Sequence, residues 1–179
     1  MTNREIVVGV SGGIASYKTA ALVSQLVQAG HGVSVVMTAA AQQFVGQATF
    51  AALTGRAVAT EIFADATHPL GAHIALAERA ELLCVAPATA NFLAKAANGL
   101  ADDLLSTLYL AFPRQTLIAP AMNCEMWNKA AVQRNLKQLR DDGVEVVDPE
   151  EGWLSCRTRG VGRMAAPETI LAAIHRALD

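Results

Sequence analysis

Residues 5–37 read EIVVGVSGGIASYKTAALVSQLVQAGHGVSVVM, and this stretch decides the fold. The β-branched apolar run Glu5 to Val10 stops at the glycine turn Ser11-Gly12-Gly13. Apolar residues then recur at helical spacing between Tyr17 and Ala29, before a second β-branched run from Val33 to Met37. The order strand, glycine turn, helix, strand predicts a β-α-β unit with parallel strands and a right-handed crossover.

The same alternation continues to the end of the chain. Further strands are expected at Leu82 to Ala86, directly before Pro120, and at Val144 to Val147. Helices are expected at about 89–97, 103–110 and 128–142, and from Pro167 onward. Alternating strands and helices predict a doubly wound parallel sheet, Rossmann-like or flavodoxin-like, in a single domain over 1–179.

Composition narrows the class of protein. The chain is 53% hydrophobic and 17% charged, which favours a doubly buried sheet and association into an oligomer. A net charge of -2 without a basic stripe argues against nucleic acid, and the apolar runs are too short to span a membrane. Because Met1 leads almost directly into a strand, no signal peptide is expected and the predicted location is cytoplasmic. The three cysteines lack CxxC spacing, so neither a disulfide framework nor a metal site is expected.

Two strand ends carry groups suited to an anion. Backbone N–H groups near Ser11, Gly12 and Gly13, with the hydroxyl of Thr38 after the second strand, predict a mononucleotide site. Thr38 stands where a dinucleotide site has an acidic residue. A tight turn that needs only small residues for packing explains the glycines equally well.

Two motifs resemble those of a known family. Residues 120–127, PAMNCEMW, are similar to the PxMNxxMW motif of the flavin-dependent cysteine decarboxylases, and residues 87–91, PATAN, are similar to the PASANT motif of the same family. Thr89 replaces the first serine of that motif, Phe92 replaces its final threonine, and Thr89 could also simply cap a helix. The resemblance implies bound FMN, and the cofactor-binding residues it implies are Ser11, Gly12, Gly13, Thr38, Ala88, Thr89, Asn91 and Ala121.

The resemblance extends to a third segment, the flap (residues about 150–165), which is expected to be a mobile glycine-rich loop without regular structure. It is similar to the family pattern GxLACGxxGxGRM, except that Arg157 stands where the family has the glycine after its cysteine. If that glycine needs a positive φ, the flap here must bend differently. Basic neighbours are expected to lower the pKa of Cys156.

The remaining site residues also come from the resemblance. His73 precedes an Ile-x-Leu-Ala sequence similar to the family's active-site histidine segment. The resemblance assigns catalysis to His73 and Cys156, and substrate binding to Asn123, Met126 and Arg163.

Within the family, the chain most resembles the branch that decarboxylates 4'-phospho-N-pantothenoylcysteine, a phosphorylated cysteine conjugate, to 4'-phosphopantetheine for coenzyme A. The implied route oxidises the cysteinyl part to a thioaldehyde, releases carbon dioxide and reduces the resulting enethiol. Trimers, or stacked trimers, with FMN at the subunit interface are implied, and a fused or partner ligase domain is left open. The alternatives are a peptidyl-cysteine decarboxylase of peptide maturation and a non-catalytic flavin-binding regulatory subunit.

Overall fold

The computed structural model describes residues 3–63 and 71–179, and their core is one parallel sheet with the strand order β2-β1-β3-β4-β5. The strands are β1 (Glu5–Val10), β2 (Gly32–Met37), β3 (Leu82–Ala88), β4 (Thr116–Pro120) and β5 (Glu145–Val146). This is the flavodoxin-like order, so the predicted doubly wound fold is confirmed. Only β5 is shorter than expected.

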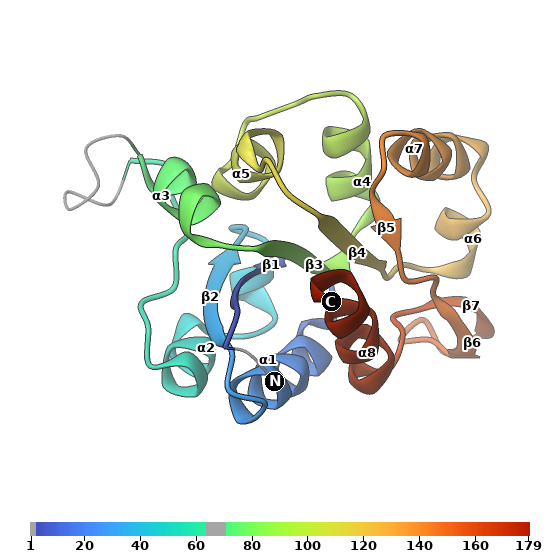
Figure 1. The fold of residues 1–179 in the computed structure, drawn as a ribbon. Coiled ribbons are helices and arrows are strands. Elements are labelled where there is room, and N and C mark those ends of the chain that lie inside the picture. The colour runs from blue at the N-terminus through green and yellow to red at the C-terminus, as the bar shows by residue number, and fades with distance from the viewer. Residues whose placement is uncertain (1–2, 64–70) are drawn as a thin grey trace.

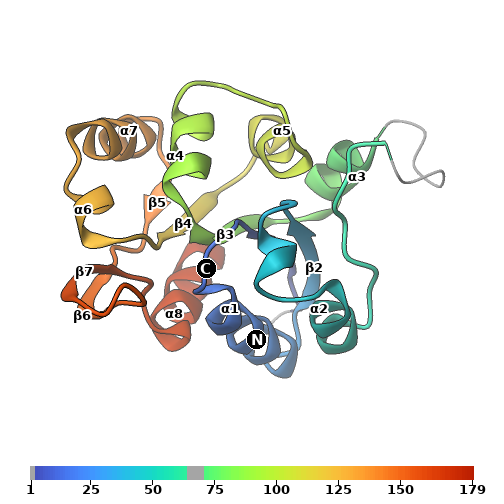
Figure 2. The same ribbon diagram turned by 180° about the vertical axis from the view of Figure 1, so that it is seen from behind.

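Helices cover both faces of the sheet (Figure 1), as the view from behind also shows (Figure 2). One face is covered by α1 (Ser16–Gln28), α2 (Gln47–Thr54) and α8 (Pro167–Leu178). The other is covered by α3 (Ala72–Arg79), α4 (Ala90–Ala97), α5 (Leu104–Ala111) and α7 (Ala130–Asp141). Each face therefore has its own apolar core, and β3 between them is buried along its whole length.

Three short elements were not predicted from the sequence. They are the 3-10 helix η1 (Ala41–Gln43), α2 and α3. Both α2 and α3 have only eight residues and begin after a glycine without a side-chain cap, so the usual start signals are missing. The helix expected from 128 begins at Ala130, and a separate turn, α6 (Cys124–Trp127), precedes it.

The flap is also not the irregular loop that the sequence suggested. It contains an antiparallel ribbon of β6 (Glu150–Trp153) and β7 (Arg159–Arg163). Glycines at 152, 160 and 162 replace the apolar members of a strand pattern, so the alternation typical of a strand is not visible in the sequence.

The order of the sheet fixes where a ligand can bind. The chain proceeds from β1 to β2 on one side and to β3 on the other, so the connections diverge at the carboxyl ends of β1 and β3. Such a switch point opens a crevice at that edge. Within the described ranges, no helix has the length and apolar character needed to cross a membrane.

Candidate functional site

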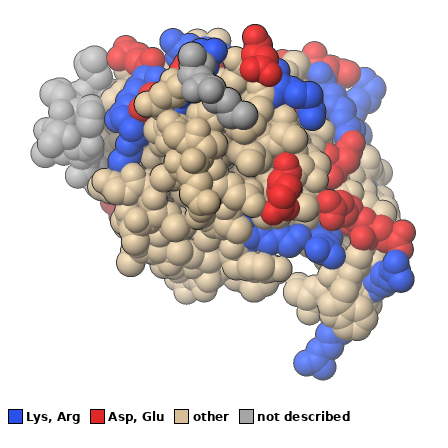
Figure 3. Space-filling model, turned by 60° about the horizontal axis from the view of Figure 1, so that its bottom comes forward, with Lys and Arg blue, Asp and Glu red and all other residues tan. Residues whose placement is uncertain are grey.

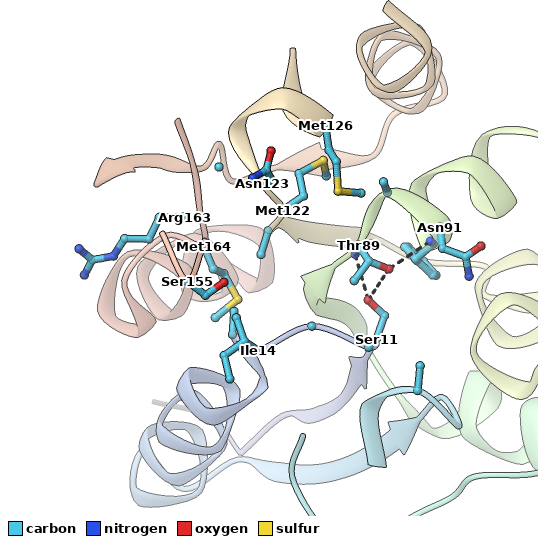
Figure 4. A pocket seen from close by; sticks show the side chains of 18 of the residues that line it. Ser11, Ile14, Thr89, Asn91, Met122, Asn123, Met126, Ser155, Arg163 and Met164 are labelled. Atoms are coloured by element: carbon cyan, nitrogen blue, oxygen red, sulfur yellow. Dashed lines mark hydrogen bonds between the residues drawn. The ribbon is translucent and has the colours of Figure 1, made fainter. Parts of the chain in front are cut away.

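A cavity of about 990 Å³ lies at the carboxyl edge of the sheet, where the segments following β1, β2, β3 and β4 meet the flap (Figure 4). It brings together most of the residues predicted from sequence. Those lining it are Ser11, Gly12, Gly13, Thr38, Thr89, Asn91, Ala121, Asn123, Met126, Cys156 and Arg163. His73 and Ala88 do not line it.

Ser11 ties β1 to β3 and has no donor left over for an anion. Its N–H and its hydroxyl both donate to the carbonyl of Pro87, at 3.3 and 2.7 Å. Its Oγ in turn accepts the N–H of Thr89 at 2.9 Å. These contacts, visible in part in Figure 4, make Ser11 a brace that fixes the distance between the two strand ends.

Free donors lie just beyond Ser11, at the start of α1. The N–H groups of Gly12, Ile14 and Ala15 have no hydrogen-bond acceptor in the described part of the chain, and no side chain caps this helix end. A Cβ on Gly12 would lie 2.3 Å from the Cβ of Ala40, so only glycine fits here. Three unsatisfied N–H groups at the positive end of a 13-residue helix fit a phosphate.

Thr38, Thr89 and Ala88 complete this end of the cavity. Thr38 Oγ1 accepts the N–H of Ala41 at 3.2 Å, which leaves its hydroxyl hydrogen available for a ligand. Thr89 caps α4, accepting the N–H of Phe92 at 3.4 Å, so the capping and cavity-lining interpretations both hold. Ala88 is fully buried behind the wall.

The other end of the cavity is built around Asn123 and Cys156, which the sequence separates by 33 positions. Asn123 Oδ1 caps α6 by accepting the N–H of Glu125 at 2.7 Å, and its Nδ2 donates to Cys156 Sγ at 3.1 Å. Thr158 Oγ1 lies 3.0 Å from the same sulfur. The hydrogen bond with Thr158, and secondarily that from Asn123, lowers the pKa of the exposed Cys156 thiol. The direction agrees with the sequence prediction, but the cause is hydrogen bonding and not the neighbouring arginines.

Backbone contacts fix the flap beside Asn123. The carbonyl of Gly162 accepts the N–H of Met122 at 2.9 Å. A Cβ on Gly162 would lie 2.3 Å from the carbonyl oxygen of Met122, and one on Gly160 would lie 2.9 Å from the Cβ of Cys124. The glycines of β7 therefore let the ribbon approach α6 closely enough to place Cys156 against Asn123.

Arg157 lies in the turn of the ribbon with a φ of 63°. Its N–H donates to the carbonyl of Leu154, and the N–H of Leu154 donates to the carbonyl of Thr158, both at 2.9 Å. From the sequence, a different bend was expected at Arg157 if this position needed a positive φ. Instead, Arg157 itself adopts the left-handed conformation that favours glycine.

His73 lies in the first turn of α3, on the other side of the sheet from α1 (Figure 1). Its ring folds back over Gly71, and its Nδ1 is buried without a hydrogen-bond partner among the described residues. A single chain therefore does not bring His73 to the cavity, and its catalytic role stays a prediction.

Lys18, Lys95 and Asp103 also line the cavity, and no sequence motif indicated them. Lys18 Nζ donates to the carbonyl of Met164 at 2.9 Å, and burial lowers its pKa. Lys95 pairs with Asp102 at 2.6 Å and with Asp103 at 2.7 Å.

Within 3–63 and 71–179, no cluster of three or more His, Cys, Asp and Glu side chains could hold a metal ion.

The sheet order and the anion site at its switch point define an α/β mononucleotide-binding protein of the Rossmann type. More particularly, the chain belongs to the family described as Flavoprotein, whose model matches residues 1–179. The coenzyme A biosynthesis bifunctional protein CoaBC of Bacillus subtilis is 47% identical over 171 residues, which are 96% of this chain and 42% of that protein. CoaBC of Mycobacterium tuberculosis is 46% identical over 98% of this chain and again 42% of its own length. The chain thus spans under half the length of these relatives.

Solved structures agree over nearly the whole chain. The FMN-dependent cysteine decarboxylase SpaF superposes with a TM-score of 0.85 at 37% identity, covering 98% of both chains. A cysteine-to-serine variant of a PPC decarboxylase, complexed with pantothenoylaminoethenethiol, superposes with a TM-score of 0.87 at 27% identity, also covering 98% of both chains.

Proposed function

We propose that this chain catalyses the FMN-dependent decarboxylation of 4'-phospho-N-pantothenoylcysteine to 4'-phosphopantetheine. The observation that carries the proposal is the contact between Asn123 and Cys156 in the same cavity as the glycine turn. A thiol beside an amide donor, facing a mononucleotide site, matches a substrate whose cysteine end must be held and protonated. CoaBC relatives at 40 to 47% identity support coenzyme A biosynthesis as the setting.

FMN fits the cavity as its cofactor. The free N–H groups at the start of α1 and the hydroxyl of Thr38 would receive its phosphate. When bound, FMN supplies the oxidation that makes loss of carbon dioxide easy and the later reduction. Membership of the Flavoprotein family and the FMN-dependent neighbours support this assignment.

The chain's own residues position the substrate and move protons. Asn123 Nδ2 is the donor placed to bind the substrate carboxylate. Cys156 delivers a proton to carbon in the reduction of the enethiol and regains it from solvent. Arg163 lies in the same lining, and its guanidinium, which points away from Asn123 and Ser11 (Figure 4), must turn inward to meet an anionic substrate. Met126 contributes an apolar side chain to the wall.

A second substrate class, a peptide that ends in cysteine, is the alternative to this proposal. SpaF, which is named only as a cysteine decarboxylase, is 37% identical to this chain, against 27% for the PPC decarboxylase. A peptidyl-cysteine substrate would need no reducing step, so the product distinguishes the two: saturated 4'-phosphopantetheine or an enethiol.

The assembly belongs to the same proposal. His73 lies away from the cavity of its own chain, so we propose that trimers bring it to the cavity of a neighbouring subunit. A ligase domain, fused or separate, would supply the substrate, and the proposed location is cytoplasmic. Light scattering that finds an active monomer would refute the trimer.

The first prediction tests the function directly. The purified protein should show the absorption spectrum of bound FMN, and incubation with phosphopantothenoylcysteine should release carbon dioxide and yield 4'-phosphopantetheine by mass spectrometry. A cysteine-terminated peptide serves as the comparison substrate. A colourless protein that does not take up added FMN, or a protein that decarboxylates only the peptide, would contradict the proposal.

A further inference from the structure

Large apolar side chains that remain exposed gather at one cavity. Ile14, Tyr17, Met126 and Trp153 line it, and each is more than 40% exposed. Single exposed apolar residues are common on protein surfaces, but several around one cavity indicate a ligand with an apolar part. Tyr17 and Trp153 are the two aromatic members, 61% and 68% exposed.

Trp153 lies on the face of the ribbon that does not contact α6. Gly152 pairs with Gly160 in the ladder, and Gly160 lies against Cys124 of α6. Because side chains alternate along a strand, Trp153 points to the opposite face from Gly152. Leu154, next in the chain, is buried and anchors the turn. The indole is therefore held on a fixed backbone while most of its surface remains in water.

The facing wall is the start of α1. Ile14 lies just before the N-cap Ala15, Tyr17 lies in the first turn of α1, and both line the cavity. Ser155 of the flap also lines the cavity, and Figure 4 draws it on the same side as Ile14. Lys18 Nζ bonds the carbonyl of Met164, directly after β7, and thereby fixes the helix relative to the base of the flap. The space-filling view shows a hollow between the body and the part that projects at its lower right (Figure 3).

We propose that Trp153 and Tyr17 bind the apolar middle of the substrate, its dimethyl and amide chain, and so set the preference for a pantothenoyl conjugate. The inference rests on the proposed function. The cysteine end of that substrate belongs at Asn123 and Cys156. The phosphate of the substrate carries the charge at its other end. The pantothenoyl segment between the cysteine end and the phosphate is uncharged. Aromatic faces suit methyl groups and amide planes, and burying the exposed rings on binding is favourable.

The experiment compares Trp153→Ala and Tyr17→Ala with the unmodified protein, using phosphopantothenoylcysteine and pantothenoylcysteine, which lacks the phosphate. Each variant should raise KM about tenfold, with kcat changed less than about twofold, because the aromatic contact holds ground state and transition state alike. The same factor is expected for both substrates, since both keep the apolar middle. Phe44→Ala, which removes an exposed aromatic ring outside the cavity lining, is the matched control and should leave KM unchanged.

A binding measurement gives a second readout that does not depend on turnover. The chain has two tryptophans, so in Trp127→Phe, with excitation that selects tryptophan, Trp153 is the only tryptophan that emits. Adding pantothenoylaminoethenethiol should shift this emission to shorter wavelength as the indole leaves water.

The outcomes separate the two proposals. An active protein whose KM is the same in Trp153→Ala, or changes only for the phosphorylated substrate, overturns this inference alone. Emission that does not shift at saturating ligand overturns it as well. An unmodified protein that does not decarboxylate either pantothenoyl substrate overturns the proposed function and this inference together.

Discussion

Arg157 shows how one residue can occupy a position suited to glycine. Its φ of 63° crowds the Cβ of an L-residue and costs about 1 kcal/mol. The turn keeps this conformation because two backbone hydrogen bonds, from the N–H groups of Leu154 and Arg157, close it. The strain is confined to the tip of the flap, so it affects local opening of the ribbon more than the fold.

Replacing Arg157 with glycine should therefore stabilise the turn. Arg157→Gly should slow hydrogen exchange of the N–H groups of residues 154 and 157 about fivefold, which corresponds to about 1 kcal/mol. Arg157→Lys keeps the Cβ and is the matched control, expected to exchange at the original rate. Faster exchange in the glycine variant would mean that the arginine side chain, not the backbone, holds the turn.

Cys156 carries the residue-level chemistry of the proposed function. Hydrogen bonds from Thr158 and Asn123 favour its thiolate and hold the sulfur at the cavity. A thiol whose pKa is lowered by hydrogen bonding is suited to donating a proton and recovering it from solvent.

Cys156→Ser should stop the reaction after carbon dioxide is lost, because a serine hydroxyl is a far weaker acid than a thiol. The expected product is the enethiol, two hydrogen atoms lighter than 4'-phosphopantetheine, found by mass spectrometry with FMN left reduced. Cys84→Ser is the control for losing a thiol, since Cys84 is buried in β3 away from the cavity. Saturated product at the normal rate from Cys156→Ser would remove Cys156 from this role.

At the scale of elements, the ribbon is held by its backbone. Met122 donates its N–H to the carbonyl of Gly162, and the ribbon has no side chain at 160 or 162 to keep α6 away. Two segments that meet through glycines can place a polar pair such as Asn123 and Cys156 within hydrogen-bond distance.

Gly162→Ala should detach the ribbon, since its Cβ would lie 2.3 Å from the carbonyl oxygen of Met122 and its φ of 145° disfavours an L-residue. Strain of this kind costs about 1–3 kcal/mol. The lost contact with Asn123 should raise the pKa of Cys156, measured as a shift to higher pH in its alkylation profile by peptide mass mapping. Gly46→Ala, with no atom within 4 Å of its Cβ and a φ of -72°, is the control. An unchanged profile in Gly162→Ala would show that the ribbon does not need this contact.

At the scale of the whole molecule, two histidines join distant parts of the chain. His31 Nε2, between α1 and β2, lies 3.2 Å from His175 Nε2 of α8. Burial, and then the nearby His175 and Arg4, lower the pKa of His31, while Glu81 acts in the opposite direction. The folded protein therefore favours neutral His31, whereas the unfolded chain takes up a proton near pH 6.5.

This difference fixes the sign of a pH effect on stability. The unfolded state binds more protons below about pH 6.5, so the free energy of unfolding should fall as pH decreases from about 7.5 to 5.5. In His31→Gln the fall should be smaller, measured by urea unfolding at several pH values. In His175→Gln it should be reduced only in part, because burial acts first on His31. An identical slope in all three proteins would contradict the role of His31.

The sequence by itself determined the fold class, because hydrophobic periods, glycine turns and alternating elements are local properties of the chain. It also indicated Ser11 to Gly13 and Thr38 as residues of an anion site at the cavity, since the carboxyl ends of parallel strands meet at one edge. The family resemblance added Thr89, Asn91, Asn123, Cys156 and Arg163.

Only the tertiary structure decided which donors are free and which residues touch. The N–H and hydroxyl groups of Ser11 are not free to bind a ligand, because both donate to the carbonyl of Pro87, 76 positions away in the sequence. Lys18 and Trp153 line the cavity, although no sequence motif indicated that they would. The antiparallel ribbon could form against α6 because its glycines leave room for that contact, and His73 of α3 does not line the cavity of its own chain. Hydrogen bonds and steric fit between distant segments depend on coordinates, and local sequence patterns do not contain them.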